Sequence, residues 1–425
     1  MIKFIHAADI HLDSPLHRLE AYEGAPVDEI RQASRRAFEN LIELAIDESV
    51  DFVLLAGDLF DGDWKDYNTG LFFISQLGRL REAGIRIFIV SGNHDAAGQV
   101  TKTLPCPDNT HIFSPRKAET VTMDTLKVAV HGQSFATAAI VDNLAAGYPE
   151  PVPGCFNIGL LHTSLTGREG HQRYAPCSID DLKNRGYDYW ALGHVHKDEI
   201  VSLDPPVVFS GCIQGRHIRE TGCKGCMLVT VGDDSPVEIV HRPLDVVRWE
   251  VLAVDLTGAI NESDCLNRFT IALGAGIDRH APLPVIVRVV FCGETTHHQR
   301  MAGDPVYWRE AVRAAALSHF GDQSWIEKIR LNSTPPKRIE ENPPAVSGPL
   351  AELNRMVAEL AGDDAQLLEL GAELSPLFQK LPAEYRQSEE AFRHDDPEGV
   401  RAVVAAAHAM LAKRLLKEGD PSENP

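Results

Sequence analysis

Five short motifs in the N-terminal half of the chain carry side chains that can bind metal ions. Each motif follows an apolar run typical of a β-strand, and each offers carboxylate oxygen, amide oxygen or imidazole nitrogen, which suit manganese, iron or zinc. The motifs are Asp9-Ile10-His11, Gly57-Asp58-Leu59-Phe60-Asp61, Gly92-Asn93-His94-Asp95, His162 after Gly159-Leu160-Leu161, and Gly193-His194-Val195-His196. Because open α/β sheets bind ligands beyond the carboxyl ends of their strands, we expect these motifs to meet at one site.

Each motif taken singly also has a structural interpretation. Asp-x-His occurs as a turn with a surface histidine, and Gly-Asp and Gly-Asn-His are typical of turns. His194 and His196 are more informative, since two histidines two apart on an extended segment point to the same side. Five such motifs, all following apolar runs, favour a shared metal site.

Residues 1–245 alternate apolar strand patterns with helical patterns. A helix is predicted from Ile30 to Ala45 by apolar residues at steps of three and four, and a second from Thr69 to Glu82. This order predicts an α/β layer fold with parallel strands. From Asp188 to His241 shorter strands with turn residues indicate a second, mostly antiparallel sheet packed against the first. The predicted early strands are Ile2–Ala7, Phe52–Ala56, Ile85–Val90, Lys127–Val130, Asn157–Leu161 and Tyr189–Leu192.

The remainder of the chain divides into three further parts. A small α+β unit is predicted for residues 246–334, with one helix, Tyr307–His319, among three strands; a proline-rich linker follows at 335–347. A helical tail is predicted at 348–418, where apolar stripes run from Leu350 to Leu360 and from Val400 to Leu415. Residues 345–425 contain 15 acidic and 8 basic residues, so the tail is acidic.

The composition excludes several classes of protein. The 425 residues include 61 acidic and 41 basic side chains, a formal charge of −20, with 44% apolar and 24% charged residues. These proportions are ordinary for a globular chain. We find no apolar run long enough to span a membrane and no secretory signal pattern, so we expect a cytoplasmic protein with reduced thiols. The acidic balance argues against coating nucleic acid through bulk charge, but not against a nuclease, because divalent cations invert the local field.

The five motifs in this order resemble the signature of the calcineurin-like metallophosphoesterases. The fuller matches around Asp9, Asp58 and His194, and the later segment Gln214-Gly215-Arg216-His217, are similar to SbcD-type DNA repair exonucleases. The resemblance is strong over residues 1–245 and loose over 246–335. It implies a catalytic domain at 1–245 that is a four-layer sandwich, two sheets flanked by helices, with residues 246–334 as a capping domain.

The resemblance also implies which residues hold two divalent ions, with manganese as the implied metal. Asp58 would bridge the two ions. The other implied ligands are Asp9, His11 and His196 for one ion, and Asn93, His162 and His194 for the other.

Other polar residues receive supporting roles. His94 would contact the phosphate and protonate the leaving alkoxide. Asp95 either orients His94 or is a solvated turn residue. Asp61, where archaeal and eukaryotic relatives often carry histidine, is expected to support a ligand histidine, and Arg216 and His217 are expected to contact substrate.

Two histidine-containing regions remain open. His131 ends a strand, where a satisfied buried histidine is a better interpretation than a place near the site. Arg168, His171 and Arg173 form a small basic cluster that either meets a nucleic-acid backbone or belongs to a solvated loop.

We compare three functions. The first is a two-metal-dependent DNA nuclease, an exonuclease acting in DNA repair; the second is a metal-dependent phosphatase or phosphodiesterase acting on nucleotides or phosphoproteins; the third is a scaffold that has lost its metals. The parts beyond residue 245 favour the nuclease, because a capping domain shapes a DNA cleft. The tail is then expected to dock an SbcC-like coiled-coil ATPase, unless it folds back on its own core, and a homodimer is a further expected partner.

Overall fold

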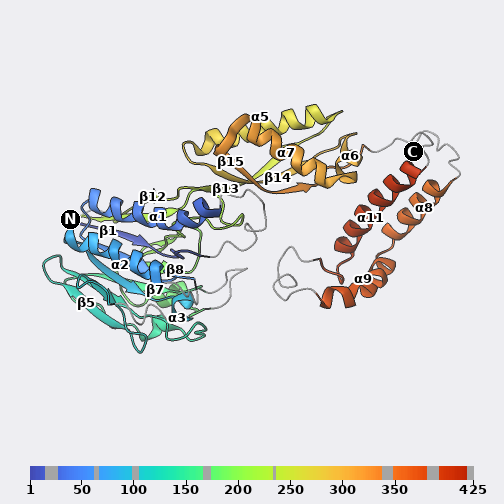
Figure 1. Cartoon of the computed structure of the whole chain (residues 1–425). Helices are drawn as coiled ribbons and strands as arrows, with labels where there is room; N and C mark the ends of the chain where they lie inside the picture. The colour runs from blue at the N-terminus through green and yellow to red at the C-terminus, as the bar shows by residue number, and fades with distance from the viewer. Residues whose placement is uncertain are drawn as a thin grey trace. The chain divides into compact units, whose positions relative to one another are not determined.

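The computed structural model describes residues 1–14, 27–61, 67–97, 105–165, 174–232, 236–336, 348–380 and 392–418 (Figure 1). The chain divides into two units. One comprises Met1–Val251, Gly276–Arg288 and Asp322–Glu327, and the other comprises Leu252–Ala275, Val289–Gly321 and Lys328–Pro425. Most of the linker predicted at 335–347 and the whole cluster around Arg168 lie outside the described residues.

The first sheet has the strand order β12-β11-β1-β2-β3-β4. β1 to β4 are parallel neighbours, while β11 and β12 run antiparallel at one side. Every residue of β2 is buried, as expected for a parallel strand covered on both faces. The strands are β1 (Ile2–Ala7), β2 (Phe52–Ala56), β3 (Arg86–Val90), β4 (Thr110–Ile112), β11 (Gly225–Val231) and β12 (Glu238–Pro243).

The second sheet, of order β5-β6-β7-β8-β10-β9, corrects the prediction of a mostly antiparallel sheet from residues 188–241. Its four central strands are parallel and only its edge strands are antiparallel, while β11 and β12 join the first sheet. The prediction failed because a pattern of short strands and turns is also typical of antiparallel strands at the edge of a parallel sheet. The strands are β5 (Glu119–Met123), β6 (Val128–Gly132), β7 (Phe156–His162), β8 (Tyr189–Gly193), β9 (Glu199–Leu203) and β10 (Pro206–Phe209).

The two sheets face each other across a shared apolar core. The ring of Phe4 on β1 stacks on Phe52 at 4.9 Å between centroids and meets Tyr189 of β8 edge-on at 5.4 Å. The outer face of the first sheet is covered by α1 (Val27–Asp47) and α2 (Tyr67–Glu82), and Trp190 lies in a core on the outer face of the second. The predicted α/β fold, two sheets flanked by helices, is confirmed.

Shorter helices complete this part of the chain. They are α3 (Asn93–Ala97), the 3-10 helix η3 (Leu144–Gly147) and α4 (Ile179–Lys183). Trp190 donates a hydrogen bond to the carbonyl of Leu182 in α4 at 3.1 Å, which fixes α4 on the second sheet.

The third sheet has the order β13-β14-β15. Alongside α7 (Pro305–Phe320), which the sequence predicts as Tyr307–His319, the chain forms a second long helix, α5 (Glu262–His280), that sequence reasoning missed. Its signal was present, since Cys265, Phe269 and Leu273 recur at steps of four and are fully buried. The remaining elements are β13 (Arg248–Asp255), β14 (Val285–Cys292), α6 (His298–Gly303), η4 (Gly321–Gln323) and β15 (Ser324–Leu331).

The C-terminal helices pack on one another. They are α8 (Pro349–Ala361), α9 (Asp364–Gln379) and α11 (Pro397–Glu418), drawn in red shades in Figure 1. Leu367, Val400 and Val404 form their buried core, with Val357 and Leu360 against it. Part of each predicted apolar stripe is therefore buried between the helices of the tail. No helix in the described part of the chain is long and apolar enough to cross a membrane.

Candidate metal centre

All seven predicted metal ligands come together where strands of the two large sheets end. Asp9 and His11 follow β1, Asp58 follows β2, and Asn93 follows β3 in the first sheet, whereas His162, His194 and His196 end or follow strands of the second. Among the described residues, Asp9, His11 and His196 place one ligand atom each within 4.8 Å of one another, and Asp58, His162 and His194 do the same. Two adjacent clusters result.

The backbone around these residues is held in sparsely populated conformations. Asp9, His11 and Asp58 have φ of 50°, 45° and 51°. These values lie in the left-handed region that non-glycine residues rarely adopt. Backbone hydrogen bonds from Asp9 to Gly57 and from His11 to Asp58, both 3.0 Å, hold the two loops against each other. Strain of this kind persists where the surrounding structure fixes it and is concentrated at functional sites.

Glycine also makes room for the ligands. A Cβ atom on Gly92 would lie 2.2 Å from Oδ1 of Asp58, and one on Gly57 would lie 2.5 Å from Nδ1 of His162. Because glycine has no side chain, the backbone at Gly92 can lie close to Asp58, and the backbone at Gly57 can lie close to His162.

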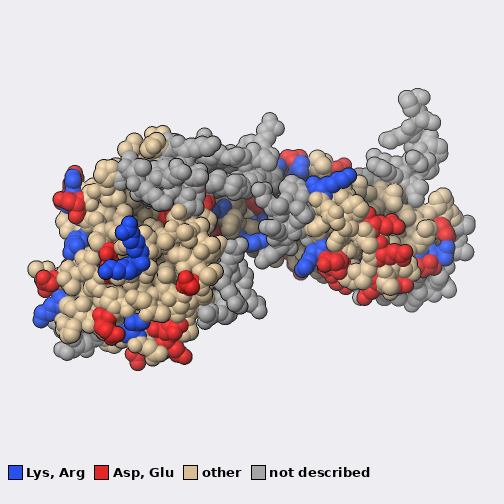
Figure 2. All heavy atoms as spheres, turned by 90° about the horizontal axis from the view of Figure 1, so that it is seen from below, with Lys and Arg blue, Asp and Glu red and all other residues tan. Residues whose placement is uncertain are grey.

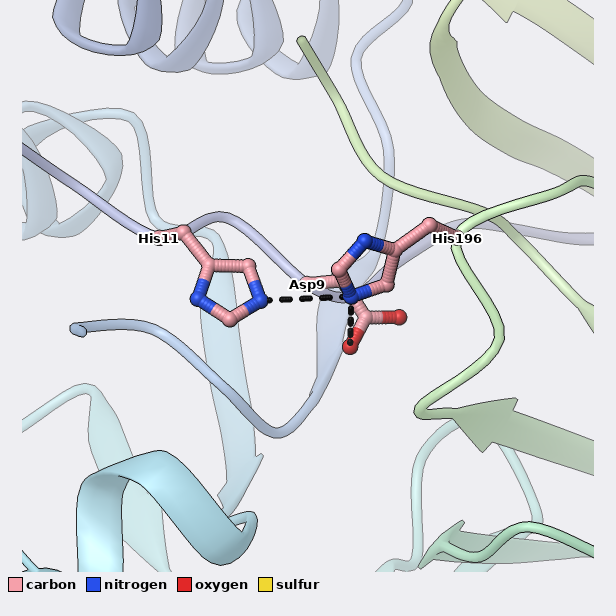
Figure 3. Close-up of side chains that lie close together, drawn as sticks. All are labelled: Asp9, His11 and His196. Carbon is pink, nitrogen blue, oxygen red and sulfur yellow. Dashed lines mark hydrogen bonds and ion pairs between the residues drawn. The ribbon is translucent and has the colours of Figure 1, made fainter. Parts of the chain in front are cut away.

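The first cluster consists of Asp9, His11 and His196 (Figure 3). The Nε2 atoms of His11 and His196 lie 3.3 Å apart, and Nε2 of His196 lies 3.8 Å from Oδ1 of Asp9. Burial, together with the charge of Arg216, holds the pKa of His11 well below its usual value. A neutral imidazole is the form that binds metal ions.

The second cluster consists of Asp58, His162 and His194, with Asn93 beside it. Nε2 of His162 lies 3.0 Å from Oδ1 of Asn93 and 3.4 Å from Oδ2 of Asp58. Because the carbonyl of Ala56 only accepts hydrogen bonds, Nδ1 of His162 donates to it at 2.9 Å and Nε2 faces the cluster. Although burial lowers the pKa of His162, the charge of Asp58 raises it to about 9. An arriving cation would therefore displace a proton.

Asp58 links the two clusters. Its Oδ2 atom lies 3.4 Å from His162 and 3.9 Å from Nε2 of His11, while Oδ1 accepts a hydrogen bond from the backbone N–H of His94 at 3.0 Å. Burial alone raises the pKa of Asp58, but the nearby imidazoles lower it by more, and the carboxylate stays charged. One buried carboxylate thus faces both imidazole sets, as a bridging ligand must.

The donor set fits two divalent ions. It combines imidazole nitrogen with carboxylate and amide oxygen and contains no thiolate, which suits manganese, iron or zinc more than a soft metal. Asp9, His11 and His196 would hold one ion, Asn93, His162 and His194 the other, and Asp58 both. When bound, such a pair would polarise a phosphoryl oxygen and stabilise the attacking and leaving oxygens of a displacement.

His94 differs from the ligands because 42% of its side chain is exposed. Its Nδ1 atom lies 2.7 Å from Oδ1 of Asp61, and this hydrogen bond raises the pKa of His94. The contact with Asp61 therefore favours the protonated form of the partly exposed imidazole. Asp61, predicted to support a ligand histidine, makes its short contact with His94 and lies 3.9 Å from Nδ1 of His11.

Asp95 is not a solvated turn residue, because only 3% of it is exposed. Its carboxylate accepts backbone hydrogen bonds from Leu59 at 2.9 Å and from Phe60 and Gly92 at 3.0 Å. Burial and the neighbouring charge of Asp58 raise the pKa of Asp95 to about 7. Its contacts tie the loop after β2 to the loop after β3, and the predicted orientation of His94 is carried by Asp61.

Arg216 and His217 occupy the rim of the first cluster. Arg216 donates to Oγ of Ser14 at 3.2 Å and to Oδ2 of Asp61 at 3.4 Å, so it contacts the residue that orients His94. Just over half of the His217 side chain is exposed, and its Nε2 lies 3.5 Å from Glu220. The expected contacts of both residues with substrate stay predictions.

Glu220 and Ser14 belong to the site but were not identified from the sequence. Glu220 lies 2.5 Å from Nδ1 of His196 and Ser14 donates to Asp61. Neither belongs to a motif with metal-ligand spacing. Glu220 lies in the segment that resembles the SbcD-type exonucleases, but the sequence does not show that its side chain reaches His196. His131, for which a buried structural histidine was the better interpretation, is buried and forms a hydrogen bond with Asn157 at 3.0 Å. Its role is therefore structural.

Two family models match the chain. Residues 2–198 match the calcineurin-like phosphoesterases, and residues 249–334 match the middle domain of metallophosphoesterase YhaO. The uncharacterised metallophosphoesterase YhaO of Bacillus subtilis (strain 168) is 40% identical over 264 residues, which cover 61% of this chain and 64% of that protein.

The chain is less similar to two DNA double-strand break repair proteins. The DNA double-strand break repair protein Mre11 of Sulfurisphaera tokodaii is 28% identical over 277 residues, covering 60% of this chain and 65% of that protein. Mre11 of Methanopyrus kandleri is 27% identical over 214 residues, covering 46% of this chain and 44% of that protein. The aligned regions span less than two thirds of the length of each of these relatives.

Proposed function

We propose that this chain, whose residues 2–198 match the calcineurin-like phosphoesterases, is a two-metal-dependent nuclease that hydrolyses phosphodiester bonds in DNA. The observation that carries the proposal is the position of Asp58 between the two imidazole sets. A charged carboxylate shared in this way fixes the separation of two ions, and two-metal sites are typical of phosphoester hydrolysis.

The residues outside the ligand sets supply proton transfer. His94, which is partly exposed and whose pKa is raised by the hydrogen bond to Asp61, would donate a proton to the leaving 3′ or 5′ oxygen. Arg216 donates a hydrogen bond to Oδ2 of Asp61, the carboxylate oxygen that does not contact His94. Removal of His94 would leave the ligand sets intact and remove the acid.

DNA as the substrate is supported by the similarity to two proteins named for double-strand break repair. Manganese as the metal and an exonuclease reaction are part of the proposal because the motifs resemble those of SbcD-type exonucleases. The formal charge of −20 requires that attraction for the phosphate backbone come from the metal centre and from local groups such as Arg216. A phosphatase or phosphodiesterase acting on nucleotides or phosphoproteins is the alternative, because the more similar of these relatives is an uncharacterised metallophosphoesterase.

An ATPase of the SbcC kind is the proposed partner of the C-terminal helices. Although Val400 and Val404 are buried inside the tail, other apolar side chains on the same helices are exposed, among them Met356, Met410 and Leu411 at 58%, 57% and 47%. Packing of an apolar helix face into a hydrophobic groove of a partner is a recurring mode of protein recognition.

The proposal is tested with the purified chain, freed of metal and supplied with manganese. Labelled linear duplex DNA, single-stranded DNA and mononucleotide phosphatase substrates are compared with and without the ion. Manganese-dependent cleavage of DNA that exceeds mononucleotide hydrolysis is expected. Hydrolysis of mononucleotides alone would favour the phosphatase, and no hydrolysis of any substrate would contradict both functions.

A further inference from the structure

Glu220 is a buried carboxylate that contacts the metal centre without being one of the predicted ligands. Only 5% of it is exposed. Its Oε1 atom lies 2.5 Å from Nδ1 of His196, and its Oε2 atom accepts the backbone N–H of Arg216 at 2.7 Å. Both carboxylate oxygens are thus engaged by groups of the site.

The contact with Glu220 decides the tautomer of His196. Nδ1 of His196 lies 2.5 Å from Oε1 of Glu220 and 3.4 Å from a guanidinium nitrogen of Arg216. A carboxylate only accepts hydrogen bonds, so in the much shorter of these two contacts Nδ1 carries the proton that is shared with Glu220. In the neutral ring the lone pair then lies on Nε2, the atom that faces His11 and Asp9. Ligand histidines in metal sites commonly donate their other N–H to a carboxylate, which fixes the ring and strengthens the ligand.

The same carboxylate connects the metal ligand to the candidate acid. One arm of Arg216 lies 3.4 Å from Oε1 of Glu220, and the other lies 3.4 Å from Oδ2 of Asp61. Asp61 in turn holds Nδ1 of His94 at 2.7 Å. A continuous chain of polar contacts therefore runs from His196 through Glu220, Arg216 and Asp61 to His94.

We infer that Glu220 is a positioning residue: it fixes His196 with Nε2 toward the first ion and, through Arg216, keeps Asp61 and His94 aligned with that ion. The inference rests on the proposed two-metal function. A purely structural role, in which Glu220 only fastens its own loop through the N–H of Arg216, is the competing explanation. The two explanations differ in what happens to His196.

The first measurement uses the unmodified chain. Nitrogen-15 spectra of histidine-labelled, metal-free protein at alkaline pH report which ring nitrogen of His196 is protonated, with the signal assigned by comparison with His196→Gln. Protonation of Nδ1 is expected. Protonation of Nε2 would overturn the inference, and this result does not depend on any Glu220 variant folding.

The second measurement compares manganese binding by Glu220→Gln and by Glu238→Gln. Glutamine keeps the volume of Glu220 but offers one acceptor oxygen, so it cannot serve both His196 and the N–H of Arg216. Glu238 is exposed at the start of β12 and is the matched control. Free manganese is counted by electron paramagnetic resonance during titration of each metal-free protein, and thermal unfolding of each is recorded.

One of two ions is expected to bind about 10- to 100-fold more weakly to Glu220→Gln, with Glu238→Gln unchanged. Equal affinities in Glu220→Gln and the unmodified chain would overturn the inference. Neither readout uses a substrate. A chain that shows this dependence on Glu220 yet cleaves no phosphodiester would therefore contradict the proposed function and leave the inference standing.

Discussion

At the scale of single residues, Asp58 is the group on which both ligand sets depend. Its Oδ2 atom faces His11 and His162, whereas His162 belongs to one set alone. Asp58→Ala is expected to lose both ions, and His162→Ala only one. Both should lower phosphodiester cleavage by about 10³-fold or more, since each ion supplies several kcal/mol of charge stabilisation. Metal content of the purified variants tests this, and two ions in Asp58→Ala would refute the bridge.

His94 should give a different signature. His94→Ala is expected to keep both ions, because the ring is not among the predicted ligands, but to lower turnover on DNA by roughly 10²- to 10⁴-fold. A nitrophenyl phosphodiester, whose leaving group needs little protonation, should lose far less activity. Equal losses on the two substrates would indicate that His94 binds phosphate and does not donate a proton.

The contact between Asp61 and His94 predicts a pH effect. The hydrogen bond to Asp61 raises the pKa of His94, and an acid is active only below its pKa. Asp61→Asn removes that charge, so the pKa of His94 falls and activity should disappear at a lower pH as the solution is made alkaline. Rate profiles across neutral and alkaline pH are compared for both proteins, and coincident alkaline limbs would exclude Asp61 as the cause.

The sequence could predict those residues that act through their own spacing. Asp9, His11, Asp58 and the histidines after β8 follow apolar runs that become strands, so their convergence follows from the fold class. Glu220 could not be found in this way, because its role is set by the course of a loop. For Asp95 the sequence left two interpretations open, orientation of His94 or a solvated turn. The structure shows a buried carboxylate that accepts three backbone hydrogen bonds.

At the scale of elements, strand positions were predictable and strand partners were not. β1 and β2 begin and end where their apolar runs do. The pairing of β11 with β1 could not be predicted, because the two strands lie far apart in the sequence. α5 was missed although its apolar residues recur with helical spacing, because Gly274 and Gly276 weaken the pattern.

The loop after β3 gives an element-scale prediction. A Cβ on Gly92 would lie 2.2 Å from Oδ1 of Asp58. Gly92→Ala should therefore displace that carboxylate and weaken metal binding, with activity falling at least about tenfold. Gly78 in α2 has no atom within 4 Å of such a Cβ. Gly78→Ala is the control and should leave activity unchanged while raising helix stability by up to about 1 kcal/mol. Unchanged metal affinity in Gly92→Ala would contradict the crowding.

At the scale of the whole molecule, net charge works against nucleic-acid binding. On the face drawn in Figure 2, acidic and basic side chains are interspersed among uncharged ones. With a formal charge of −20, long-range attraction of DNA would be weak without bound cations. We therefore expect DNA binding by the metal-free chain to be much weaker than by the manganese-loaded chain, as measured with an uncleavable duplex. Equal affinities would place DNA recognition outside the metal centre.

The tail carries a second prediction at this scale. Met410→Glu combined with Leu411→Glu places charge on exposed positions of α11 and leaves buried Val400 and Val404 in place. The double variant should keep cleavage of short DNA and lose co-purification with the SbcC-like ATPase. Val141→Glu, at a residue that is 75% exposed in the other unit, is the control. Undiminished association of the double variant would exclude this surface as the dock.

The most direct test of a phosphoester-hydrolysing centre bridged by Asp58 is one titration. Metal-free chain receives increasing manganese while bound ions and hydrolysis of a nitrophenyl phosphodiester are measured in the same samples. We predict that two ions bind per chain and that hydrolysis rises with the second, while Asp58→Asn fails to reach two ions and stays inactive. Full hydrolysis in the presence of a chelator, or with a single ion bound at saturation, would contradict the two-metal centre.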